Sequence, residues 1–165
     1  MAFDAFLKIE GVDGECSDDK HQKWIEILSY SWGVSQPQAG TRSSAGSMTA
    51  ERADFHDFNI VKVLDTSSPT LFLHCASGKH FTKATVELCR AGEDKQVYME
   101  YKFDDVAISS YRPGGSRGGQ DNLPLEEVSL NFGKVQLIYH PTSRTTGKVE
   151  GAVPAGWNLE KNIKL

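Results

Sequence analysis

The chain has 165 residues, of which 39% are hydrophobic and 24% are charged, and its 18 basic and 22 acidic side chains give a formal net charge of −4. This composition argues against a disordered chain or a coiled coil, and a nucleic-acid partner is not expected because general nucleic-acid binders are basic. The apolar runs span only a few residues, whereas a transmembrane helix needs about 20, so stable membrane insertion is not expected either. The length predicts a single domain over residues 1–165.

Near the start of the chain, residues 2–9 alternate between apolar and polar side chains, as do residues 24–32 and 97–104. Because successive side chains of a strand point to opposite faces, these segments are predicted to be half-buried strands. Residues 24–32 are apolar on much of both faces, and we expect the large side chains Trp24, Leu28 and Trp32 to lie in the core. Asp4 and Lys8 interrupt the first segment, so no signal peptide is expected.

One short helix is predicted at residues 69–77. Ser67-Ser68-Pro69 offers an N-cap followed by proline in the first turn, and Gly78 offers a stop. We expect this helix to pack on the barrel described next.

In two longer segments the apolar residues alternate with polar ones, but part of the way along they switch between even-numbered and odd-numbered positions. The switch falls at Gly133-Lys134 within residues 125–140 and at Asp104-Asp105 in the segment that begins at 97. A β-bulge at each place would keep both halves facing one core and would bend the strand. A last strand is expected at residues 157–163. The predicted fold class is therefore all-β, an antiparallel barrel made of two packed curved sheets with the helix on its flank.

Gly114 to Gly118 matches the G-x-S-x-G pattern of a hydrolase around Ser116. That chemistry needs a buried strand before the serine and a helix after it, and the flanking residues favour a loop instead. Gly114 and Gly119 also have P-loop spacing, but Gln120 stands where the phosphate-binding lysine is required. The chain is therefore not expected to be an enzyme.

The histidines and cysteines show no metal-site spacing. His74, Cys75 and His80 gather around the predicted helix, but adjacent helical residues point in different directions. Cys16 and His21 share an acidic loop, which disfavours a reactive thiolate. We expect no cofactor, no metal site, and free thiols typical of a protein made in a reducing compartment.

Several segments, taken in order, resemble one protein family. They are Gly14-Glu15 with Lys20-His21, Ser31–Gly33, Asp65 with Pro69, Ser77–Phe81, Ser109-Ser110 with the glycine loop that follows, Glu127–Val135 and Gly156–Leu159. Together they are similar to the haemolysin-coregulated protein (Hcp) family, the inner-tube protein of the bacterial type VI secretion system. The resemblance covers essentially the whole chain, although Cys16 replaces a common serine and residues 34–47 match no family pattern.

This resemblance implies that six copies form a ring and that rings stack into a tube related to contractile phage tail tubes. The partners implied are other copies of the chain, effector proteins carried in the lumen, and the contractile sheath and spike proteins. A contracting sheath would fire the tube from the cytoplasm, so the protein would be secreted without a signal peptide. The chain ends at Leu165, soon after the last expected strand, which favours a structural member without a fused toxin domain.

The candidate contact residues follow from strand 24–32 and from two loops. Ser29 and Ser31 lie opposite the large side chains of that strand, so we expect them to face outward and to contact effectors in the lumen. Ring contacts are expected from Ser35, Gln36, Gly40, Arg112 and Arg117. Two alternatives stay open: a monomeric barrel that binds a small ligand in an apolar interior cavity, and a hydrolase with a defined pocket around Ser116.

Overall fold

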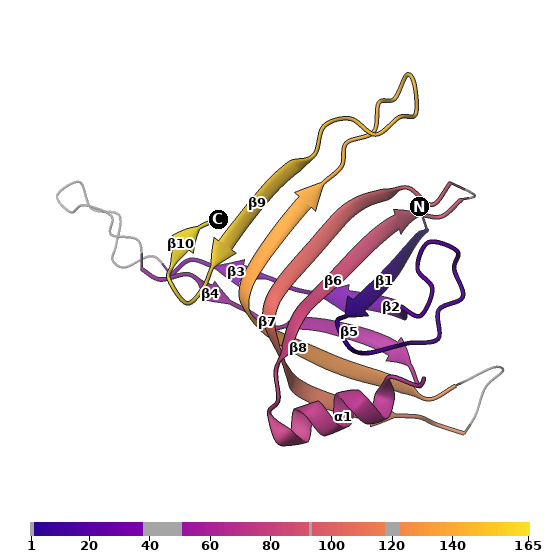
Figure 1. Cartoon of the computed structure of the whole chain (residues 1–165), viewed down its shortest axis with the longest axis vertical. Helices are drawn as coiled ribbons and strands as arrows, with labels where there is room; N and C mark the ends of the chain where they lie inside the picture. The colour runs from indigo at the N-terminus through magenta and orange to yellow at the C-terminus, as the bar shows by residue number, and fades with distance from the viewer. Residues whose placement is uncertain (1, 38–50, 93, 118–122) are drawn as a thin grey trace.

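The computed structural model describes residues 2–37, 51–92, 94–117 and 123–165 (Figure 1). Six strands close an antiparallel barrel: β1 (Phe3–Ile9), β2 (Ile25–Ser31), β5 (Phe58–Val63), β6 (Phe81–Arg90), β7 (Val97–Gly114) and β8 (Leu125–Tyr139). The remaining elements are β3 (Val34–Ser35), β4 (Asp54–Phe55), α1 (Ser68–Ser77), β9 (Val153–Asn158) and β10 (Ile163–Lys164). The all-β barrel with one short helix is confirmed, and a single continuous sheet closes it.

The barrel closes because β8 pairs with β5 on one side and with β7 on the other. The spatial order β8-β5-β2-β1-β6-β7 then returns to β8, and β9 and β10 extend the sheet outside the barrel. β3 and β4 form a separate two-stranded ribbon (Figure 1). Strands β5 and β6 were not among the sequence expectations. No helix in the described part of the chain is long and apolar enough to cross a membrane.

Aromatic side chains fill the inside of the barrel. The ring centroid of Phe103 lies 5.1 Å from that of Phe58 and 4.8 Å from that of Phe132. Tyr101 packs against Phe58 at 5.4 Å. Aliphatic residues such as Leu7 complete this core and are fully buried. Burial of these large side chains is the main favourable contribution to the stability of the barrel.

β2 buries smaller side chains than the sequence suggested. Ile25 and Ile27 lie in the core, whereas Leu28 is 54% exposed, so the expected burial of Leu28 is wrong. The pairing of β2 with β5 is irregular between Ile27 and Ser29. This irregularity reverses the alternation, so Tyr30 faces the core while Ser29 is exposed on the outside.

β7 and β8 change parity at the expected level, but not through the expected bulges. Phe103 and Val106 of β7 oppose Val135 and Phe132 of β8, so the register is the same on both sides of the switch. The predicted bulges at Asp104-Asp105 and Gly133-Lys134 are therefore wrong. Each strand has one extra outward-facing residue at this level. Because the two extra residues lie opposite each other, the register between the strands does not change. The irregular register between these strands lies instead between Ile108 and Ser110.

The helix begins one residue earlier than predicted. Pro69 stands in its first turn, and Gly78 adopts φ 68 and donates its N–H to the carbonyl of His74. A positive φ suits glycine because it has no Cβ to clash. At the other end of the chain the predicted strand 157–163 is corrected to two strands, since β9 ends at Asn158 and a turn separates it from β10.

Candidate functional site

Two adjoining hollows lie on the outside of the barrel where β2, β5, β8 and the end of β7 run side by side. Their volumes are about 790 and 320 Å³. We call this surface the β2–β5–β8 face and define it by the outward residues Leu28, Ser29, Ser31, Asn59, Val61, Val63, Arg112, Leu125, Glu127 and Ser129.

Strand alternation and register place these side chains together. On β5, Phe58 and Ile60 are buried in the core, so Asn59 between them faces outward. Asn59 is the register partner of Ser31 on β2 and of Ser129 on β8. The Ser129 hydroxyl donates a hydrogen bond to Asn59 Oδ1 at 2.5 Å. A row of small, uncharged polar groups therefore crosses three strands.

The polar row continues to Asp57 just before β5. Ser109 Oγ donates to one carboxylate oxygen of Asp57 at 2.6 Å, and Asn131 Nδ2 donates to the other at 3.0 Å. Asp57 thus joins β7 and β8 at the start of β5. These hydrogen bonds hold the polar part of the surface in one arrangement.

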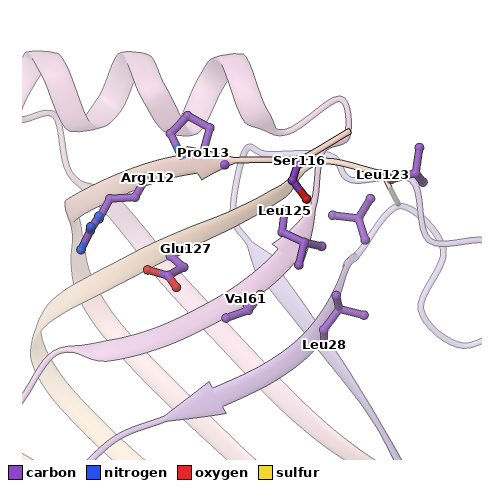
Figure 2. A pocket seen from close by; sticks show the side chains of 11 residues that line it. Leu28, Val61, Arg112, Pro113, Ser116, Leu123, Leu125 and Glu127 are labelled. Carbon is purple, nitrogen blue, oxygen red and sulfur yellow. The ribbon is translucent and has the colours of Figure 1, made fainter. Parts of the chain in front are cut away.

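The larger hollow has an apolar end and a charged end. Figure 2 shows Leu28, Leu123 and Leu125 near Ser116, with the side chains of Arg112 and Glu127 extending at the opposite end. Leu123 is 66% exposed and Leu28 54% exposed, so the hollow offers uncovered apolar surface. Chemically, this surface is suited to contact a polypeptide that has both apolar and polar groups.

A buried ion pair supports this face from inside. Lys62 Nζ lies 2.7 Å from Glu126 Oε2, and both side chains are fully buried. Ser68 at the start of α1 donates to the same carboxylate oxygen at 2.9 Å, which ties the helix to β5 and β8. Tyr111 donates its hydroxyl to the other oxygen. Burial and this bond to Glu126 raise the pKa of Tyr111 to about 12.

The structure brings together some of the candidate contact residues. Ser29, Ser31 and Arg112 line the same hollow. Ser35 lies in the β3–β4 ribbon, and Gln36 after it donates a side-chain hydrogen bond to the carbonyl of Glu51. Neither belongs to the β2–β5–β8 face, and nor does the exposed Arg117. Gly40 lies outside the described residues.

Sequence reasoning missed the β5 and β8 contributions to this face, chiefly Asn59, Val61, Glu127 and Ser129. The signal available was the alternation of residues 58–63. A lysine at position 62, among the buried positions, obscured this pattern.

Ser116 lies at the rim of the larger hollow, after β7. No histidine stands among the described residues that line this hollow, so none of them offers the imidazole base typical of a serine nucleophile. The packed aromatic core, in turn, gives no support to a ligand site inside the barrel.

His74, Cys75 and His80 do not converge. His74 Nδ1 donates to the carbonyl of Thr70 at 2.9 Å, whereas His80 Nδ1 lies 2.8 Å from a carboxylate oxygen of Asp105. These histidines have separate partners on the helix and on β7.

Comparison with known proteins gives consistent matches along the chain. A family model for the type VI secretion system effector Hcp matches residues 6–139. Protein hcp1 of Pseudomonas aeruginosa is 39% identical over an alignment 165 residues long, and the alignment covers 99% of this chain and 99% of its own. A solved type six secretion system protein has a TM-score of 0.92 at 34% identity and covers 99% of this chain and 100% of its own. Hcp1 from Salmonella typhimurium has a TM-score of 0.82 at 32% identity, with 100% of both chains covered. The chain belongs to the Hcp family of type VI secretion system proteins.

Proposed function

We propose that this chain is the structural subunit of a type VI secretion tube, in which six copies close a ring and rings stack. In this proposal the protein has no catalytic role and acts as a single tube-subunit domain. It leaves the cytoplasm with the tube, without a signal peptide, and contacts the sheath and spike proteins of the system. Membership of the Hcp family along the length of the chain supports this role.

The observation that carries the cargo role is the composition of the β2–β5–β8 face. Ser29, Ser31, Asn59 and Ser129 give it short uncharged polar groups, and the neighbouring leucines add modest apolar surface. Cargo in a channel must bind and then leave, which suits many weak contacts rather than a few strong ones. We therefore propose that this face lines the lumen of the ring and contacts effector proteins.

The ring itself is tested by measuring its mass. Light scattering after gel filtration is expected to give about six times the 18.2 kDa of one chain, because the proposed ring contains six copies. Negative-stain images are expected to show rings with a central hole. A clean monomer at micromolar concentration contradicts the tube proposal and favours the monomeric ligand-binding alternative.

The lumen contact is tested by Ser31→Gln. The serine side chain is exposed, so the larger amide leaves the core untouched and obstructs the channel wall. We expect an unchanged ring mass and reduced co-purification of effectors. Thr82→Gln, an exposed residue of β6 outside this face, is the matched control and is expected to leave co-purification unchanged. If rings dissociate, Ser31 belongs to the subunit seam, and if cargo is unaffected, it is no contact.

A further inference from the structure

A cluster of ligand-type side chains lies on the outside of β1 and β6, under the segment that joins β1 to β2. His21 comes from that segment and is 1% exposed. Its ring stacks on Phe6 of β1 with centroids 4.1 Å apart. Glu87 and Cys89 stand two residues apart on β6. Within the described chain, one ligand atom from each of His21, Glu87 and Cys89 lies within 4.8 Å of the other two.

We propose that His21 Nε2, Glu87 and Cys89 Sγ form a zinc site with three protein ligands and a water in the fourth position. An imidazole, a thiolate and a carboxylate are ligand types that zinc takes together, and three protein ligands leave one open position. The thiolate disfavours magnesium and calcium, which prefer oxygen ligands. The site is separate from the β2–β5–β8 face, so this inference does not depend on the proposed function.

The distances approach those of a tetrahedral ion and reach them after small movements of two side chains. Zinc bonds of about 2.0 Å to nitrogen and oxygen and 2.3 Å to sulfur separate tetrahedral ligand atoms by about 3.3–3.6 Å. Cys89 Sγ lies 3.9 Å from His21 Nε2, and Glu87 Oε2 lies 2.6 Å from it. The Glu87 oxygen must therefore move away from His21 Nε2 by less than about 1 Å, and Cys89 Sγ must move toward Nε2 by a few tenths of an ångström. Its side chain is 17% exposed and has solvent on one side.

The groups around these ligands match those of a zinc site. His21 Nδ1 lies 2.7 Å from Asp18 Oδ2, so a carboxylate fixes the ring through the nitrogen that does not face the ion. Asp18 is in turn paired with Lys95. The Lys95 and His21 hydrogen bonds lower the pKa of Asp18 to about 2.

Both ring nitrogens of His21 face carboxylate oxygens, Nδ1 that of Asp18 and Nε2 that of Glu87. Zinc binds the thiolate form of cysteine and an unprotonated nitrogen of histidine, so any proton on these two ligand atoms leaves to solvent as the ion binds.

Sequence analysis predicted no metal site, and the reason is the separation along the chain. His21 and Glu87 are 66 residues apart and meet only because β1 pairs with β6 beneath the covering segment. The cysteine that stands near His21 in sequence is Cys16, whereas the one near it in space is Cys89.

Cobalt(II) titration of untagged, chelator-treated protein tests the site. The wild-type chain is expected to take up one cobalt per chain and to show a sulfur-to-cobalt charge-transfer band with intense tetrahedral visible bands. Cys75→Ser, which removes a thiol from α1, is the matched control and is expected to keep the spectrum. Cys89→Ser is expected to abolish the charge-transfer band. Absence of that band from wild-type protein overturns the proposal, as does its survival in Cys89→Ser.

Zinc affinity supplies a second measurement that does not depend on the cysteine variant. In competition with a chromophoric chelator, Asp18→Asn is expected to weaken zinc binding about 10- to 100-fold, as loss of a carboxylate behind a zinc-bound histidine does. Asp19→Asn, an exposed neighbour, is the control. Equal affinity in wild type and Asp18→Asn contradicts the assigned orientation of His21 and overturns the site. Circular dichroism at the same protein concentration verifies that each variant is folded.

Discussion

Glu126 of β8 accepts hydrogen bonds from three side chains of the described residues, and it does so without contact with solvent. Its two oxygens receive Lys62, Ser68 and Tyr111, which come from β5, α1 and β7. Removal of one partner from such a buried group leaves the others unpaired, and this costs more than the loss of a single surface bond. The adjacent Glu127 points to the opposite face and is exposed, as strand alternation requires.

The pair Glu126 and Glu127 therefore offers a matched test. Glu126→Gln is expected to lower the free energy of unfolding by about 3 kcal/mol, near the lower end for a broken buried ion pair, because Lys62 keeps Asp65 at 3.0 Å. Glu127→Gln is expected to change it by less than about 0.5 kcal/mol. Urea unfolding at one fixed chain concentration measures both. Similar losses in the two variants would contradict the support role of Glu126.

At the scale of elements, the segment between β1 and β2 is packed backbone against backbone. Gly14 N–H donates to the carbonyl of Lys23 at 2.8 Å, and Cys16 N–H donates to that of Trp24 at 3.0 Å. A Cβ at position 14 would lie 2.4 Å from the Trp24 carbonyl oxygen, closer than any real contact allows. The absence of a side chain at Gly14 therefore lets the start of this segment pack closely against its end, at Trp24 and Ile25 where β2 begins.

Gly14→Ala tests this close approach. The backbone must shift to accept the methyl group, and we expect a loss of about 1–3 kcal/mol in the free energy of unfolding, as for other overpacked sites. Gly92→Ala is the control, since a Cβ there meets open space. Its effect is expected to stay within about 0.5 kcal/mol. An unchanged denaturation midpoint for Gly14→Ala would show that the segment is not held against β2.

At the scale of the whole molecule, the sequence predicted the barrel but not its complete set of strands. Alternation identified β1, β2 and the two long strands, and cap residues identified α1. β5 was missed because a fully buried lysine, Lys62, occupies a core position. β6 was missed because its buried positions pass from Phe81 to Ala84, which interrupts the two-residue alternation. Periodicity detects a strand only while burial follows hydrophobicity along it.

The candidate site was less predictable than the fold because it depends on register between distant strands. Ser31, Asn59 and Ser129 come together only through the pairings of β2 with β5 and of β5 with β8. The alternation in the sequence predicted that Ser31 faces outward, which agrees with its exposure in the structure. The same alternation predicted that Leu28 lies in the core, which is wrong. A one-residue irregularity reverses the two faces of a strand, and nothing in the local pattern marks where it falls.

The paired change of parity in β7 and β8 constrains how the chain can vary in length. Deletion of Asp105 alone would put Val106 opposite Gly133 and would turn half of one long strand inside out relative to the other. Loss of both Asp105 and Gly133 would restore simple alternation in each strand and keep the other β7–β8 pairings, but it would move Val106 out of register with Phe81 of β6. β6 changes parity at the same level, between Phe81 and Ala84, so a change of length at this corner of the barrel keeps the register only when β6, β7 and β8 change together.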